Sequence, residues 1–215
     1  MARASYKKPQ LEAPIIYGFT CRNPYDRLLS AYKDKVLGED NYTYIMKEPC
    51  EWLTYNSPML TFKQFVTCVV DRVRATALRN RLDNLSGYIA SHTLDIHWRP
   101  IFHSALPCHV NYTLISDFKN FAEDSQRVLA LLHINSSVPH TNPSSKIGRT
   151  DWYTEIDASL ITALQQIYFW DFIIFGYKST PPGMVGVVAT TDNVYRWWKI
   201  KLSMLKSCIS VNRDL

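Results

Sequence analysis

The chain has 215 residues, of which 47% are hydrophobic and 20% are charged, and its formal net charge is +5. This composition is typical of a folded protein and excludes global disorder, and the length allows one domain, alone or with an extension, to bury a sizeable core. The mild positive charge suits an anionic partner, but it does not distinguish a nucleotide, an acidic polysaccharide, a nucleic acid or a membrane surface.

The sequence carries conflicting signals about its compartment. Four Asn-x-Ser/Thr sequons, at Asn41, Asn84, Asn111 and Asn135, favour the secretory pathway. Residues 1–14 lack the apolar core of a signal peptide, and no apolar run reaches the roughly 18 residues of a transmembrane helix. We therefore expect either that the sequons are unused or that the chain is missing its N-terminal portion.

The five cysteines form neither a CxxC pair nor a zinc-like spacing with histidine. Their odd number leaves at least one thiol unpaired within a monomer. They are Cys21, Cys50, Cys68, Cys108 and Cys208.

The N-terminal part of the chain predicts a strand, a tight turn and a helix. Residues 15–21 form a short apolar run, which is typical of a buried strand in a parallel sheet. Asn23-Pro24 then punctuates the chain, and apolar residues recur at helical spacing as far as Val36. After a loop at 39–60, a second helix over 61–74 begins at a capping threonine.

The rest of the chain alternates in the same way. A second strand is expected at 112–116, and helices are expected at 118–133, 154–168 and, basic and amphipathic, 197–206. Loops are expected between them, and residues 75–110 show no clean period. Strands separated by helices indicate an α/β domain with a parallel sheet, whose ligands bind beyond the carboxyl ends of the strands.

The turn after the first strand is a candidate phosphate site. Arg22 precedes a helix N-terminus, where free N–H groups and the helix dipole attract anions, and its guanidinium adds a two-pronged donor. Ser30 follows about two helical turns later, so its hydroxyl can donate to the same anion. These residues alone leave open a surface arginine and a serine that faces another element.

Four motifs in order resemble the Golgi carbohydrate sulfotransferases. Residues 22–35, RNPYDRLLSAYKDK, resemble the motif that binds the 3′-phosphate of the sulfo donor PAPS in the chondroitin/dermatan 4-O-sulfotransferases and their relatives. HWRP at 97–100, the segment at 107–118 and IYFWDFIIFGY at 167–177 are similar to the further signatures of that family. One position departs from the pattern: where the family usually has a cysteine three residues before Cys108, this chain has Ala105, so Cys108 would pair elsewhere or remain free.

The resemblance implies a P-loop-like sulfotransferase fold, an α/β fold with a central parallel sheet flanked by helices. The domain would cover residues 14–178, after a lead-in at 1–13 and before a C-terminal extension at 179–215. Arg22 and Ser30 would bind the 3′-phosphate, and the residues between them would form the shell of the site: Asn23, Pro24, Tyr25, Asp26, Arg27, Leu28 and Leu29.

The implied activity is transfer of a sulfo group from PAPS to a hydroxyl of a glycan, such as a chondroitin or dermatan chain. PAPS would be a co-substrate that leaves as PAP, no metal would be needed, and no nucleic acid would be a partner. The place of action would be the Golgi lumen, with membrane association by family only, because this chain shows no anchor or signal peptide.

His97 is the candidate catalytic base. A sugar hydroxyl becomes a good nucleophile only as its proton is removed, and histidine can accept a proton near neutral pH. A packed structural role for His97 beside Trp98 is the alternative. Arg99 is expected to pair with a protein carboxylate rather than with an acidic sugar, and Trp98 is expected in the core.

One family element is absent from residues 1–21. The upstream loop of the type PKxGSTxW, whose lysine and amides hold the 5′-phosphosulfate, has no counterpart there. Without it the main electrostatic stabilisation of the leaving group is lost, so we expect that the first phosphate-loop unit is missing and that the chain as written transfers sulfate poorly.

Two other functions stay open. The first is a non-catalytic glycan- or nucleotide-binding relative. The second is nucleic-acid binding through a cluster of four arginines, which has no docking motif and which we interpret as a solvated helix face or a contact for a sulfated glycan. The arginines are Arg72, Arg74, Arg79 and Arg81.

Overall fold

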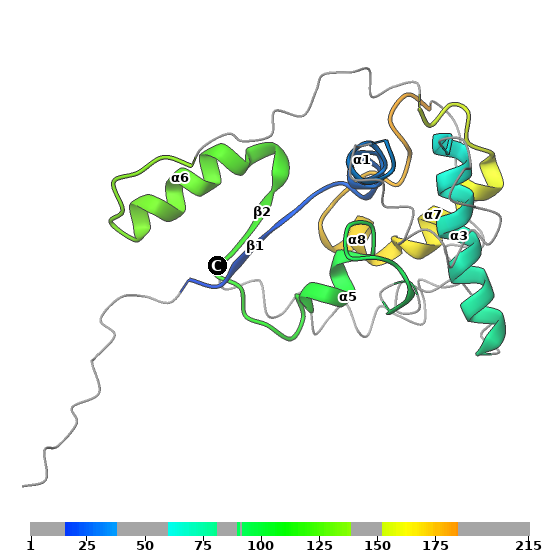
Figure 1. The fold of residues 1–215 in the computed structure, drawn as a ribbon. Helices are drawn as coiled ribbons and strands as arrows, with labels where there is room; N and C mark the ends of the chain where they lie inside the picture. The colour runs from blue at the N-terminus through cyan, green and yellow to red at the C-terminus, as the bar shows by residue number, and fades with distance from the viewer. Residues whose placement is uncertain (1–15, 38–59, 81–89, 91, 139–151, 185–215) are drawn as a thin grey trace, which may run out of the picture. The chain divides into compact units, whose positions relative to one another are not determined.

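The computed structural model describes residues 16–37, 60–80, 90, 92–138 and 152–184 (Figure 1). The chain divides into two compact units. The smaller comprises residues 1–20 and 112–143, and the larger comprises residues 21–111 and 144–215. Each unit is described by itself below.

The smaller unit contains a parallel sheet of two strands among its described residues, β1 (Gly18–Cys21) and β2 (Leu114–Asp117), of which Cys21 already belongs to the larger unit (Figure 1). Glycine at position 18 allows β1 to approach β2 closely, because a Cβ there would lie 3.1 Å from the carbonyl oxygen of Leu114, a tight contact. Both predicted strands are confirmed, and β1 is shorter than the apolar run that predicted it.

A helical segment follows β2, as predicted. It starts with one 3₁₀ turn, η2 (Phe118–Asn120), and continues as α6 (Phe121–Leu131). The tight first turn is held by Asp117, whose carboxylate accepts a hydrogen bond from the Lys119 N–H at 2.9 Å. Asp124 on α6 accepts the Ser116 hydroxyl at 2.5 Å, which ties the helix back to β2.

The larger unit opens with the predicted turn and helix α1 (Pro24–Ala31). Asn23 caps this helix, because its side-chain oxygen accepts the Tyr25 N–H at 2.9 Å, and proline occupies the first helical position. A π-helical stretch, η1 (Tyr32–Val36), continues α1. The predicted strand, turn and helix are therefore present.

Helix α3 (Phe62–Arg79) confirms the predicted second helix and its cap. Thr61 and Gln64 form a reciprocal capping box, with the Thr61 N–H donating to Gln64 Oε1 at 2.8 Å and the Gln64 N–H to Thr61 Oγ1 at 3.3 Å. The helix runs five residues beyond the predicted end because its buried stripe continues through Ala77.

Three further helices complete the described part of the larger unit: α5 (Ile101–Ala105), α7 (Ala158–Ile167) and α8 (Phe169–Ile174). The predicted helix at 154–168 is present as α7 but begins later, because the chain first makes a turn in which the Ile156 N–H donates to the Tyr153 carbonyl at 3.1 Å. The short helices α5 and α8 were not predicted.

The hydrophobic core of the larger unit lies between helices rather than on a sheet. Its largest fully buried side chains come from α1, α3, α7, the turn before α7 and the C-cap of α7: Tyr25, Leu28, Phe65, Val66, Val69, Val70, Val73, Tyr153, Ile161, Leu164, Ile167 and Tyr168. The prediction of mixed helices and strands with a parallel sheet is confirmed in this coarse form. In the described residues the sheet has two strands.

Several predictions fall outside the described residues, including most of the loop at 39–60, the helix at 197–206, the lead-in at 1–13 and nearly all of the extension at 179–215. Within the described part of the chain, no helix has both the length and the apolarity to cross a membrane.

Buried tyrosine hydroxyls fix α1 against its surroundings. The Tyr153 hydroxyl donates to the Tyr25 carbonyl at 2.7 Å, and the Tyr25 hydroxyl donates to the Ser179 carbonyl at 2.7 Å. Burial raises the pKa of both phenols above its ordinary value, so both remain neutral donors at physiological pH.

Tyr153→Phe is expected to lower the free energy of unfolding by about 1 kcal/mol, because it deletes one buried hydrogen bond without removing the ring. Tyr17→Phe is the matched control, since Tyr17 is 57% exposed, and it should change stability by less than about 0.5 kcal/mol. Urea unfolding followed by circular dichroism measures both values. Equal stability of the two variants would contradict the assigned role of the hydroxyl.

Candidate functional site

The predicted phosphate-binding residues lie on one short segment of the larger unit. Arg22 directly follows β1, Asn23 caps α1, and Ser30 lies in the last turn of α1. Arg22 and Ser30 are both partly exposed. The helical rise puts Ser30 about 10 Å along the axis from the cap, a distance that a long arginine side chain can largely span. Their joint contact with an anion stays a prediction.

Most of the predicted shell between these two residues packs inside the protein. Pro24, Tyr25, Leu28 and Leu29 are buried, so their side chains hold α1 in place and do not line an open site. Asp26 and the cap Asn23 are partly exposed. The segment therefore has a structural face and a more exposed face.

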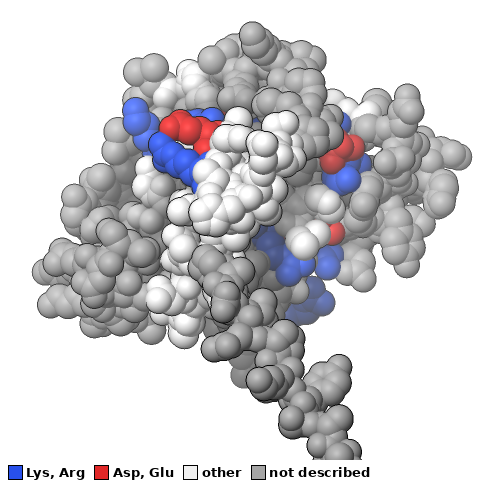
Figure 2. Space-filling model, turned by 90° about the vertical axis from the view of Figure 1, so that its left-hand side faces the viewer, with Lys and Arg blue, Asp and Glu red and all other residues white. Residues whose placement is uncertain are grey.

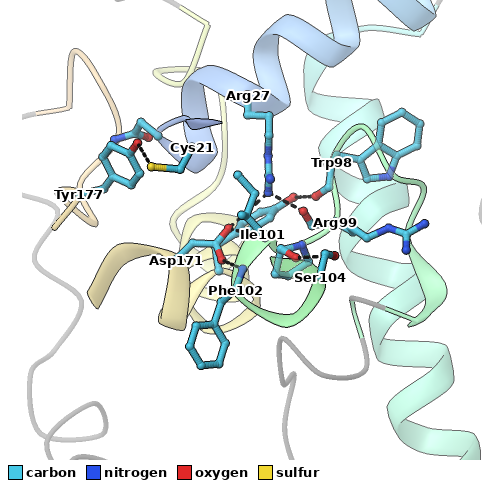
Figure 3. Close-up of polar contacts among 12 residues, drawn as sticks. Cys21, Arg27, Trp98, Arg99, Ile101, Phe102, Ser104, Asp171 and Tyr177 are labelled. Carbon is cyan, nitrogen blue, oxygen red and sulfur yellow. Dashed lines mark hydrogen bonds and ion pairs between the residues drawn. The ribbon is translucent and has the colours of Figure 1, made fainter. Parts of the chain in front are cut away.

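Arg27, also in the predicted shell, is an internal connector. Its Nη2 donates to the carbonyl oxygen of Arg99 at 2.5 Å and lies 3.3 Å from Oδ2 of Asp171 (Figure 3). Its guanidinium also lies over the ring of Tyr168, 5.7 Å from the ring centre. The charge of Arg27 is thus used within the protein.

Asp171, on α8, is the buried carboxylate at the centre of these contacts, with 1% of its side chain exposed. It accepts the N–H groups of Ile101 and Phe102 at 2.9 and 2.8 Å, and so caps the first turn of α5 (Figure 3). Burial raises the pKa of the Asp171 carboxyl above its ordinary value, while the Arg27 charge and the two N–H groups oppose that rise.

The HWRP segment is held as a tight turn. The N–H groups of Trp98 and Arg99 donate to the Asp95 carbonyl at 3.1 and 2.9 Å. The Tyr168 hydroxyl donates to the Trp98 carbonyl, and the Trp98 ring packs edge-on against Phe65 of α3 at 5.3 Å. Trp98 is therefore a core residue, as expected.

His97 projects from this turn beside an acidic partner. Its Nδ1 lies 2.5 Å from Oδ1 of Asp95, and the same oxygen accepts the His97 backbone N–H at 2.9 Å. The His97 side chain is 36% exposed and that of Asp95 is 19% exposed. A carboxylate at Nδ1 holds the proton on that nitrogen and leaves the lone pair on Nε2, which is the tautomer that a general base needs.

The side chain of Arg99 lacks the ion pair that was expected for it among the described residues. No acidic side chain in the described residues forms an ion pair with its guanidinium, and its Nε is buried without a hydrogen-bond partner. The guanidinium points away from Asp171 (Figure 3). Among the described residues, the expectation of a protein carboxylate for Arg99 is therefore not met.

The described cysteines occur both in disulfides and as a thiol. Cys68 and Cys108 are disulfide-bonded, whereas Cys21 is a buried thiol outside any disulfide, which the Tyr177 hydroxyl approaches at 3.2 Å. The odd count predicted at least one cysteine outside a disulfide, and Cys21 confirms it. Of the two outcomes expected for Cys108, pairing elsewhere or remaining free, the structure shows a disulfide.

The arginines of α3 are engaged with the protein. Arg74 pairs with Asp71 at 3.2 Å, Arg79 Nε donates to the Ala75 carbonyl at 3.4 Å, and Arg72 Nε donates to the Thr93 carbonyl. On the face drawn in Figure 2, basic side chains form small groups, several of them beside acidic ones. The described residues also contain no group of three metal-ligand side chains.

The sequence of the chain matches a known protein family. The model of the sulfotransferase family matches residues 15–178, which is most of the chain. The chain therefore belongs to the sulfotransferase family. No solved structure matches it significantly.

Individual relatives are carbohydrate sulfotransferases. The chain is 24% identical to rat carbohydrate sulfotransferase 11 over 176 residues, which cover 73% of this chain and 45% of that protein. It is 24% identical to mouse carbohydrate sulfotransferase 12 over 169 residues, covering 73% and 38%, and 23% identical to human carbohydrate sulfotransferase 9 over 177 residues, covering 74% and 36%. The chain thus matches less than half the length of these relatives.

Two residues of this region, Asp95 and Asp171, were not predicted from the sequence. The spacing Asp95-Ile96-His97 carried a local signal, because an aspartate often accepts the backbone N–H two residues later and can then meet the side chain there. Asp171 carried no such signal, because its partners lie about 70 and 144 positions away in the sequence.

Arg27→Met is expected to lower the free energy of unfolding by about 3 kcal/mol near neutral pH, because it leaves the Asp171 charge buried without its counter-ion. The pKa of Asp171 should then rise further. Since a protonated carboxyl needs no counter-ion, the loss should be small below about pH 4 and grow as the pH rises through the raised pKa.

Denaturant unfolding at several pH values measures this loss. The double variant with Asp171→Asn is the control, because it removes the buried charge together with its partner and should abolish the added pH dependence. A loss in Arg27→Met that is the same at pH 4 and pH 7 would exclude an electrostatic role for the pair.

Proposed function

We propose that this chain acts in the transfer of a sulfo group from PAPS to a hydroxyl of a glycan that contains N-acetylgalactosamine or glucuronate, such as chondroitin or dermatan. The observation that carries the proposal is the family match over residues 15–178, together with the contacts of Arg27, which join three of the motifs through the Arg99 carbonyl and the Asp171 carboxylate. The named relatives are carbohydrate sulfotransferases, which supports a glycan acceptor.

The donor nucleotide is assigned to the turn between β1 and α1. Arg22 supplies a permanent charge and Ser30 a hydroxyl for the 3′-phosphate, while the buried side chains of Tyr25 and Leu28 keep α1 fixed. The larger fold, a P-loop-like sheet flanked by helices with a domain at 14–178, belongs to the same proposal. No resident metal is needed, because this chemistry is served by cations and N–H groups of the protein.

His97 is assigned as the base for the acceptor. Its Nε2 takes the proton of the sugar hydroxyl as the sugar oxygen bonds to sulfur, and the bond from sulfur to the 5′-phosphate oxygen breaks, which releases PAP. Asp95 is a positioning residue, because its contacts at 2.5 and 2.9 Å fix the ring and the tautomer of His97.

An oxidising compartment such as the Golgi lumen is part of the proposal. Cys68 and Cys108 are disulfide-bonded, and disulfides persist mainly in the secretory pathway. The sequon asparagines Asn111 and Asn135 are both exposed, so a glycan can be attached at either without disturbing a core.

Arg22→Ala is expected to weaken binding of PAP by about 1.5–3 kcal/mol, or roughly 10- to 150-fold in Kd, because it removes a charge-assisted pair with the 3′-phosphate. Arg74→Ala is the matched control, since Arg74 is an exposed arginine paired with Asp71 on α3. Isothermal titration calorimetry with PAP measures both. Unchanged affinity in Arg22→Ala would remove this turn from the donor site.

His97→Gln is expected to slow sulfo transfer by about 100-fold or more without changing the affinity for PAP, since it deletes the base and leaves the donor turn intact. Asp95→Asn should slow transfer by about tenfold or more, because its amide can donate to Nδ1 and stabilise the wrong tautomer. Transfer of labelled sulfate from PAPS to chondroitin measures the rates.

The ¹⁵N shifts of the His97 ring, assigned by their absence in His97→Gln, report the tautomer independently of turnover. Wild-type protein that binds PAP but transfers no sulfate would favour the non-catalytic nucleotide-binding relative. Full transfer by His97→Gln would exclude this histidine as the base.

A further inference from the structure

The guanidinium of Arg99 is a charged group without an acceptor in the described part of the fold. The backbone of Arg99 is held on both sides, because its N–H donates to the Asp95 carbonyl at 2.9 Å and its own carbonyl accepts Arg27 Nη2 at 2.5 Å. Its Nε is buried without a hydrogen-bond partner, and the side chain points away from Asp171 (Figure 3).

Arg27 and Arg99 differ in the acceptors that their guanidinium groups contact. Both arginines leave a buried Nε unpaired, but Arg27 uses Nη2 for two acceptors and stacks over Tyr168. Arg99 has no such acceptor among the described residues. A guanidinium stays charged at any physiological pH, and buried donors in native proteins are nearly always paired. None of the described side chains neutralises the partly buried charge of Arg99. Its guanidinium is therefore available to bind an anionic group of a ligand.

We propose that Arg99 binds an acidic group of the glycan acceptor, namely the carboxylate of a uronate sugar; this inference rests on the proposed function. The planar fork of a guanidinium matches a carboxylate in a two-pronged contact. Arg99 lies in the same tight turn as His97, the proposed acceptor base, whereas the donor's 3′-phosphate is assigned to Arg22 on a different segment.

The chemistry Arg99 recognises is an oxyanion, which can come from the acceptor or from the donor's phosphosulfate. Calorimetry with three probes separates these sources: a chondroitin oligosaccharide, the same oligosaccharide with its carboxyl groups reduced to alcohols, and PAP. Arg99→Gln should weaken binding of the chondroitin oligosaccharide about tenfold or more. The same variant should bind the reduced oligosaccharide and PAP as the wild type does.

Two further variants complete the test. Arg74→Gln removes an exposed arginine that is paired on α3 and should bind all three probes normally. Arg99→Lys keeps the charge but loses the fork, so its affinity for chondroitin should fall between those of the wild type and Arg99→Gln. Thermal unfolding by circular dichroism verifies that each variant is folded.

Four results of these titrations support or overturn the proposal. Loss of PAP affinity with unchanged chondroitin affinity in Arg99→Gln would assign the anion to the donor and overturn the acceptor proposal, as would equal affinity of all variants for chondroitin. Selective loss of chondroitin affinity supports the proposal. If the wild type binds chondroitin through Arg99 but never binds PAP, the proposed function fails while the acceptor site stands.

Discussion

The larger unit depends on one buried carboxylate. Asp171, on α8, caps α5 through two backbone N–H groups and faces the guanidinium of Arg27 on α1 (Figure 3). A carboxylate that is 1% exposed is costly unless its oxygens are occupied, and here three donors occupy them. This requirement fixes α1, α5 and α8 to one another, and with them the turn that carries His97.

The sulfotransferase motifs therefore combine two kinds of residue. Arg27, Trp98 and Asp171 lie inside and hold the segments together. Arg22, Ser30, His97 and Arg99 are partly exposed on those same segments and carry the proposed chemistry. A motif shared within a family thus reports structural support as much as ligand contact, and burial separates the two roles.

Rigidity of the segments is what the proposed chemistry needs most. Sulfo transfer depends on a base and anion contacts held within small distances of the reacting atoms. Several contacts restrict the movement of α1 or of the HWRP turn. They are the Asn23 cap, the hydrogen bonds of the Tyr25 and Tyr153 hydroxyls, and the contacts of Asp95. The Asp95 contacts act on His97 itself, through its backbone N–H and its ring Nδ1.

Local signals in the sequence determined much of the fold. Asn23-Pro24 and the Thr61–Gln64 box fixed where two helices begin, because capping depends only on neighbouring residues. The four motifs, read in order along the chain, also indicated the family, and the match over residues 15–178 confirmed it. Arg22, Ser30 and His97 were proposed from the same motifs and stay proposals.

Tertiary structure decided the rest, because the deciding partners are distant in sequence. Only folding brings Arg27 to Asp171, 144 positions away, and so turns a predicted shell residue into a structural one. Only folding shows that Arg99 lacks the expected carboxylate among the described residues, and that the core of the larger unit lies between helices. Periodicity reports which face of a segment is apolar, but not which charge or which helix that face will meet.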